Sequence, residues 1–128
     1  MIKVYVRKQS NFPVRATKVK ARLKSFLQEN GIVSDTYVYV NFVGEKSMKA
    51  LARKYLGEKD TLHSVLSFPE SETKKKFVYP DDIIRLGEIV LCYPVVVDEA
   101  KKDNVLIGDK INELVEHGAW HLLGKHHD

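Results

Sequence analysis

The chain has 128 residues, of which 44% are hydrophobic and 30% are charged, the proportions of one globular domain with room for a core. Its net charge of +4 is compatible with RNA as a partner, although many proteins that never bind nucleic acid are as basic. No apolar run approaches the roughly 20 residues of a membrane span, and no basic stretch before a long apolar run predicts a secretory signal. The single cysteine excludes an internal disulfide and is consistent with a reducing cytoplasm.

Two kinds of periodicity organise the first half of the chain. Apolar and polar side chains alternate over residues 2–7 and 36–43, as they do in strands. Apolar side chains recur every three or four residues over 14–29 and 48–56, as they do in helices that pack on a core. Glycines that can end these segments follow at Gly31, Gly44 and Gly57.

The second half predicts two more strands and two more helices. The strands are expected at about 63–68 and 87–92, joined by an exposed polar loop over 70–82 that carries Lys74-Lys75-Lys76. That lysine run fits either a solvated loop or an arm that contacts phosphates. Pro94 suits the first turn of a third helix, and the carboxylate of Asp109 is expected to cap the last one.

The predicted order β-α-β-α-β-β-α-α indicates an α/β (α+β) fold. We expect one domain over residues 1–128, in which a small mixed sheet of about four strands packs with the helices. The last helix is expected near the centre of this structure. Its core-facing residues are predicted to be Ile111, Leu114, Val115, Ala119 and Leu122.

Four of the five histidines fall in the last twelve residues: His117, His121, His126 and His127. A helix presents His117 and His121 on one face, one turn apart, so both imidazoles can bind one metal ion. Gly124 can end the helix and turn the chain back, which would bring His127 to the pair as a third ligand. Three neutral imidazoles with a vacant fourth position are typical of a catalytic zinc site, because structural sites are closed by four ligands.

The spacing H-x-x-x-H-x-x-G-x-x-H also occurs in metzincin proteases, but one position differs. Those enzymes have a glutamate after the first histidine as general base, and this chain has Gly118. Glu116, on the other side of His117, is rotated about 100° round the helix and points elsewhere. Peptide hydrolysis of that type is therefore disfavoured.

The same segment resembles the signature H-G-x-L-H-L-x-G-Y-D-H of the YbeY family of bacterial metal-dependent endoribonucleases and ribosomal RNA maturation factors. Residues 65–69 are similar to the family's V-L-S-F-P and residues 86–92 to its L-G-D-I-x-I-C, so the resemblance covers roughly 36–128. The signature is matched by His117-Gly118, His121-Leu122, Gly124 and His127. The departures are Trp120, Lys125 and His126.

This resemblance implies a zinc-dependent endoribonuclease that cleaves single-stranded RNA in ribosomal RNA maturation, at the 3′ end of small-subunit rRNA, and in ribosome quality control. Its expected partners are RNA and the ribosome, with no membrane, and its expected location is the cytoplasm. One zinc ion per chain would be bound by His117, His121 and His127. The attacking group can be water or the 2′-hydroxyl of the RNA itself.

The family's arginine before the glycine that ends the second helix is replaced by Leu56. Arg53 or Lys54, both within one turn, can substitute for it, and we assign Arg53 and His117 as catalytic residues. The missing arginine favours an alternative, in which the chain is a non-catalytic ribosome-assembly or RNA-binding factor that zinc stabilises.

Five further residues leave alternatives open. Glu88 can orient a ligand imidazole or bond to backbone, and His63 can reach the cleft or be an ordinary polar strand residue. His126 is an alternative third ligand, Trp120 can pack or stack on a base, and Cys92 is expected to be buried.

Overall fold

The structure is a computed structural model and describes residues 1–70 and 83–124. The elements follow the predicted order β-α-β-α-β-β-α-α. The predicted strand at 36–43 is confirmed at both ends, and the helix predicted at 14–29 begins two residues later than expected. The lysine run of the predicted loop, His126 and His127 lie outside the described residues.

The bounds of the described strands and helices are β1 (Ile2–Lys8), α1 (Ala16–Glu29), β2 (Thr36–Val43), α2 (Glu45–Leu56), β3 (Val65–Pro69), β4 (Ile84–Cys92), α4 (Tyr93–Asp103) and α5 (Ile107–Leu122).

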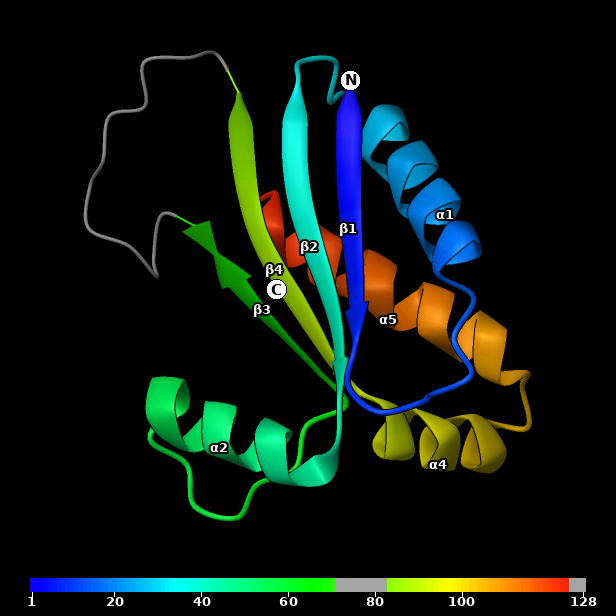
Figure 1. Ribbon diagram of the computed structural model, residues 1–128, viewed down its shortest axis with the longest axis vertical. Helices are drawn as coiled ribbons and strands as arrows, with labels where there is room; N and C mark the ends of the chain where they lie inside the picture. Colours follow the sequence, from blue (N-terminus) through cyan, green and yellow to red (C-terminus); the bar gives the residue numbers. More distant parts are fainter. Residues whose placement is uncertain (71–82, 125–128) are drawn as a thin grey trace.

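The four described strands form one mixed sheet, as predicted, and their order in it is β1-β2-β4-β3 (Figure 1). β1, β2 and β4 run parallel, and β3 pairs antiparallel with β4. The register places Tyr5 opposite Tyr39, Tyr39 opposite Glu88, and Glu88 opposite Phe68. Since paired residues point to the same side of a sheet, these four side chains share one face.

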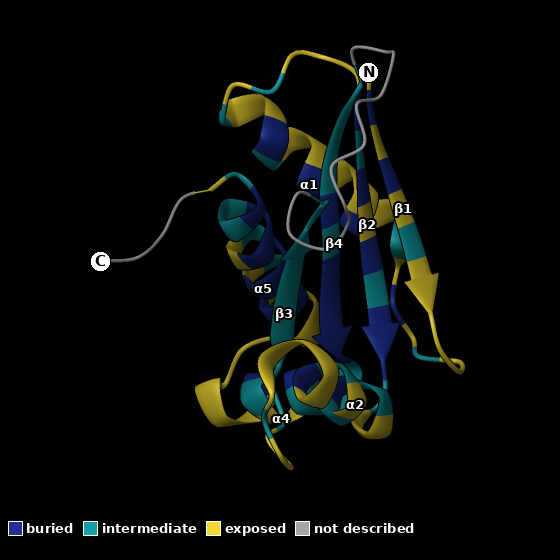
Figure 2. Ribbon diagram, turned by 90° about the vertical axis from the view of Figure 1, so that its left-hand side faces the viewer, coloured by how far each residue is buried: buried dark blue, intermediate teal, exposed yellow. Residues whose placement is uncertain are grey.

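The two faces of the sheet are covered differently. Helices α1 and α5 pack against one of them, which we call the helix face (Figures 1 and 2). On the other, which we call the open face, α2 packs only at the end where β2 and β4 finish. Along β1 and β2 buried residues alternate with more exposed ones, as the sequence predicted. The core residues of the helix face include Leu23, Leu27, Val38, Val40, Phe42, Ile89, Leu91, Val115 and Ala119.

Helix α5 is the element on which the candidate site depends, and it packs on β3, β4, α1 and α4. Its five predicted core residues are all buried. Lys110 is only 4% exposed and donates at 2.5 Å to Asp103, the last residue of α4, which joins the two helices. It also donates at 3.1 Å to Glu113 within α5. These hydrogen bonds raise the pKa of Lys110 above its ordinary value.

The predicted cap at Asp109 is wrong. The helix begins at Ile107, its N-cap is Leu106 with no side-chain cap bond, and Asp109 lies in the first turn. The left-handed conformation of Asn104 ends α4, and the Val105 N–H bonds back to the Ala100 carbonyl. The connection from α4 to α5 is therefore short and consists of residues 104–106. None of the described helices is long and apolar enough to span a membrane.

Candidate metal centre

Gly118 explains how α5 lies so close to the sheet. A Cβ atom at this position would stand 2.7 Å from Ile89 Cγ2 and 3.0 Å from Ser67 Oγ. The Ser67 hydroxyl also donates to the Gly118 carbonyl at 3.0 Å, which joins α5 to strand β3. A glutamate here would point into the sheet, so the position of the metzincin base has a structural role in this chain.

The two histidines of α5 converge, as their spacing predicted. The Nε2 atoms of His117 and His121 lie 3.1 Å apart, and their rings meet edge to face with centroids 4.6 Å apart. His117 is exposed and His121 is partly buried, so the pair opens toward solvent. In a tetrahedral zinc site with bonds of about 2.0–2.1 Å, two ligand nitrogens lie roughly 3.3–3.4 Å apart. The observed pair fits a zinc ion with a small adjustment.

Gly124 has the left-handed conformation predicted for the end of the helix, with a φ of +79°. Its N–H bonds to the His121 carbonyl at 2.9 Å. Over residues 1–70 and 83–124, no group of three His, Cys, Asp or Glu side chains can hold a metal ion. The predicted third ligand, His127, and its alternative, His126, lie outside this range, so the full ligand set stays a prediction.

Glu116 points away from the histidines, which confirms that it cannot serve as their base. It accepts a hydrogen bond from Arg22 Nε of α1 at 2.5 Å. This hydrogen bond, followed by the charge of Glu116, raises the pKa of Arg22. Glu116 therefore helps to hold α5 against α1.

The assignment of Arg53 as a catalytic residue stays a prediction. Arg53 is exposed on α2, and α2 packs on the open face, whereas the histidines belong to α5 on the helix face. The structure thus does not bring Arg53 to the histidine pair. Leu56, at the position of the family's arginine, is 49% exposed at the end of the same helix.

Glu88 does not orient the histidines of α5, and its hydrogen bond is to a side chain rather than to backbone. Ile89 faces α5, so its neighbour Glu88 points to the open face, away from the histidine pair. There its carboxylate accepts a hydrogen bond from Asn41 Nδ2 at 3.4 Å. Alternation along β4 keeps Glu88 from orienting the imidazole of His117 or His121, and the sequence could not indicate which side α5 would cover.

The remaining candidates lie apart from the histidine pair or in the core. His63 lies just before β3, where its Nε2 is 2.8 Å from Glu58 Oε2, so it is neither at the pair nor within a strand. Cys92 is fully buried, as predicted, and burial raises the pKa of its thiol. Trp120 is partly buried.

Comparison with known proteins identifies the family of this chain. The family described as Endoribonuclease YbeY matches residues 5–128, and the chain belongs to the YbeY family. A Thermus thermophilus protein named Endoribonuclease YbeY is 33% identical over 110 residues, which cover 86% of this chain and 75% of that protein. A protein of the same name from Thermodesulfovibrio yellowstonii is 30% identical over 136 residues, covering 96% and 82%.

A solved structure supports the same fold. The solution structure of a Thermotoga maritima protein matches with a TM-score of 0.64 and 25% identity. The match covers 98% of this chain and 75% of the other. The resemblance inferred from three short motifs thus extends over nearly the whole chain.

Proposed function

We propose that the chain is a zinc-dependent endoribonuclease that cleaves single-stranded RNA during ribosomal RNA maturation, including the 3′ end of small-subunit rRNA, and in ribosome quality control. Membership of the YbeY family and relatives named as endoribonucleases support the cleavage of RNA. The observation that carries the metal is the 3.1 Å approach of the His117 and His121 Nε2 atoms on the solvent side of α5.

The chain's own residues would hold and present the metal. His117 and His121 would bind through Nε2, with His127 as the proposed third ligand. Zinc, when bound, supplies Lewis acidity toward a phosphodiester and lowers the pKa of water to about 7. Gly118 and Ser67 keep α5 seated on the sheet, so the imidazoles need little reorganisation. The exposure of His117 leaves room for an RNA strand to approach.

The test removes one ligand and compares it with a histidine elsewhere. In His117→Ala we expect zinc well below one ion per chain and RNA cleavage at least about 100-fold slower, since even losing a group that only orients a ligand costs about 10–100-fold. His63→Ala should keep both zinc and activity. Elemental analysis and cleavage of a labelled single-stranded RNA measure the two quantities.

Two results would contradict the proposal in different ways. Full cleavage by His117→Ala would remove the histidine pair from the reaction. Purified wild-type protein that contains zinc and binds RNA but does not cleave it would favour the non-catalytic assembly factor. Leu56 in place of the family's arginine would then account for the missing activity.

A further inference from the structure

The open face of the sheet carries a set of side chains that neither the core nor the histidine pair uses. Its middle is crossed by one line of paired residues, Tyr5, Tyr39, Glu88 and Phe68, which we call the cross-strand row. Tyr5 is 44% exposed and Tyr39 is 48% exposed. Large exposed aromatic rings on a strand are available for contact with a partner.

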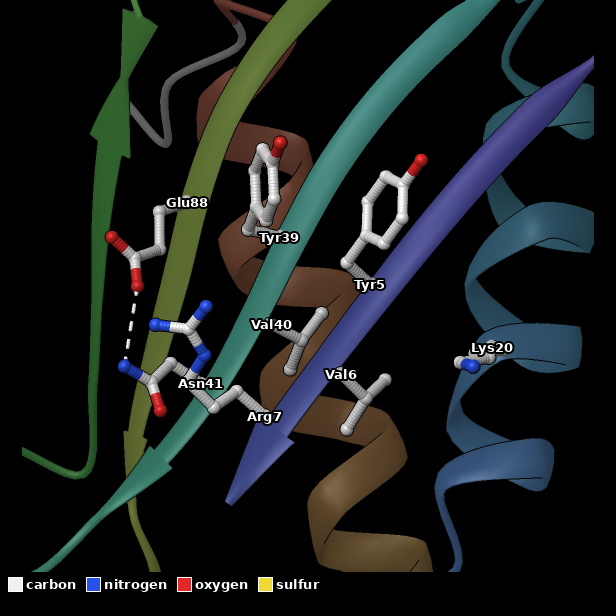
Figure 3. A pocket seen from close by; sticks show the side chains of 8 residues that line it. All are labelled: Tyr5, Val6, Arg7, Lys20, Tyr39, Val40, Asn41 and Glu88. Carbon is white, nitrogen blue, oxygen red and sulfur yellow. Dashed lines mark hydrogen bonds between the residues drawn. The ribbon is translucent and has the colours of Figure 1, made fainter. Parts of the chain in front are cut away.

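The aromatic rings of this face are arranged in contact with one another. Tyr5 and Tyr39 stack with centroids 5.2 Å apart and an interplanar angle of 21°, and they stand side by side on neighbouring strands (Figure 3). Tyr37 meets Tyr5 edge to face at 6.0 Å. At the other end of the row, Phe68 packs against Tyr55 of α2 at 4.9 Å. Rings held on a rigid sheet lose little freedom when a flat ligand stacks on them.

Two adjoining cavities follow the row. The first, of about 430 Å³, is lined by Tyr5, Arg7, Lys20, Tyr39, Asn41 and Glu88. The second, of about 390 Å³, shares Tyr39 and Glu88 with the first and continues to Tyr55, Phe68 and Glu70. Adjacent strands are about 4.8 Å apart, so four strands span roughly 14 Å, enough for two or three nucleotides.

Positive charge surrounds the rings. The register places Lys3, Arg7 and Arg85 on the open face. The first cavity also extends to Lys20, which belongs to α1 on the helix face. The cavities also contain two carboxylates among the described residues, Glu88 in both and Glu70 in the second, so the positive charge is concentrated around Tyr5 and the first cavity. Cations around stacked aromatic rings complement a polyanion whose bases are exposed, which is a single strand of nucleic acid. A duplex hides its base faces and would leave the rings unused.

The Glu88 carboxylate in the first cavity can contact base edges. Glu88 accepts from Asn41 Nδ2 at 3.4 Å, which is long for an amide–carboxylate hydrogen bond. Asn41 Oδ1 is buried with no hydrogen-bond partner among the residues that the structure describes. A base amino group is a donor of the kind that the Glu88 carboxylate accepts.

We propose that the cross-strand row and its cations form a binding surface for single-stranded RNA, on the side of the sheet opposite the histidine pair. The bases stack on Tyr5 and Tyr39, and the phosphates lie toward Lys3 and Arg7. This proposal rests on the proposed function, because it takes RNA as the substrate. It assigns to the open face the binding of the RNA strand that would be cleaved at the histidine pair.

The test compares variants that lose the two aromatic rings with variants that keep them. Tyr5→Leu combined with Tyr39→Leu removes the aromatic faces, whereas the matched Tyr5→Phe, Tyr39→Phe variant keeps them. Stacking on an aromatic side chain contributes roughly 5- to 140-fold in affinity per base, so the leucine variant should bind at least about tenfold more weakly. The phenylalanine variant should bind within about threefold of wild type.

Fluorescence anisotropy measures the binding of a labelled 2′-O-methyl 12-mer RNA to the zinc-loaded protein. A duplex of the same sequence is the second probe. The leucine variant should keep its zinc content and its maximal cleavage rate on unmodified RNA, with only the KM raised. A failure of the proposed function would instead appear as absent zinc or absent cleavage in wild type. Equal single-strand affinity in the leucine and phenylalanine variants would overturn the binding surface.

A second arm tests the position of the charge. Arg7→Gln and Arg15→Gln each remove one exposed cation, but Arg15 lies at the start of α1, away from the open face. Losing one phosphate contact lowers the slope of log Kd against log salt by about 0.7 for a single strand. That change should appear in Arg7→Gln alone. The same change in both variants would mean that only net charge matters, and would contradict the proposal.

Discussion

The two faces of the sheet use the same strands for different purposes. On the helix face, Val38, Val40 and Phe42 of β2 are at most 1% exposed beneath α1 and α5. On the open face, Tyr39 and Asn41 of the same strand line a cavity. Because side chains alternate along a strand, one stretch of sequence supplies both sets without compromise.

This difference separates what holds the fold from what remains for chemistry. Close packing on the helix face fixes α5, so the histidine pair is held by buried contacts at Gly118 and Ser67. The open face contributes half-exposed rings and cations that the core does not need. Substitutions on the two faces should therefore have different effects, and the following variants test this from the largest expected effect to the smallest.

Removal of the second histidine should disable cleavage and spare binding by the open face. In His121→Ala we expect RNA cleavage at least about 100-fold slower, with affinity for the single-stranded 12-mer within about twofold of wild type. Cleavage assays and anisotropy measure the two effects, and wild-type protein treated with a chelator is the control. A parallel loss of RNA affinity would indicate that the two faces do not act separately.

Core and open-face residues of β2 should differ strongly in stability. Phe42 is fully buried, so Phe42→Ala should lower the free energy of unfolding by about 3–5 kcal/mol. Tyr39→Leu changes two cross-strand pairs, with Tyr5 and with Glu88, and should cost about 0.4–2 kcal/mol. Urea unfolding followed by circular dichroism gives both values. Similar losses would mean that the open face belongs to the core.

The close approach of α5 to the sheet should not tolerate a methyl group. Gly118→Ala forces Cβ against Ile89 Cγ2, so overpacking should lower the free energy of unfolding by about 1–3 kcal/mol and weaken zinc binding as the helix shifts. Gly108→Ala is the matched control, because a Cβ in that first turn meets nothing within 4 Å. It should stabilise the protein by about 0.4–1 kcal/mol. A neutral Gly118→Ala would mean that the helix can move away freely.

Periodicity predicted the elements and the convergence of the histidines. The strand over 36–43, the helices closed by Gly31 and Gly57, and the pairing of His117 with His121 all follow from local spacing. Local spacing is sufficient in these cases because each feature depends on residues within one or two turns. The ligand role of the histidines and the catalytic role of Arg53 stay predictions.

Features that depend on distant segments could not be predicted in the same way. Alternation showed that Glu88 and Ile89 point to different sides of β4, but the side that α5 covers is set by packing between strands and helix far apart in sequence. For the same reason the row that joins Tyr5 to Tyr39 and Phe68 was missed, although period-two tyrosines on β2 were the available signal. Gly118 was interpreted as a missing base and as part of the family signature, whereas its structural role is the close contact with Ile89 of β4 and Ser67 of β3.

The smallest predicted effect concerns the hydrogen bond that Ser67 of β3 donates to α5. Ser67 Oγ donates to the Gly118 carbonyl at 3.0 Å, so Ser67→Ala should lower the free energy of unfolding by about 0.5–1.5 kcal/mol. Ser47→Ala removes a bond of the same length to the exposed Gln9 side chain and should change stability by less than about 0.5 kcal/mol. Urea unfolding compares the two variants. If Ser67→Ala also weakens zinc binding while Ser47→Ala does not, strand β3 helps to position the histidine pair; equal and negligible effects would leave that task to the packing at Gly118 alone.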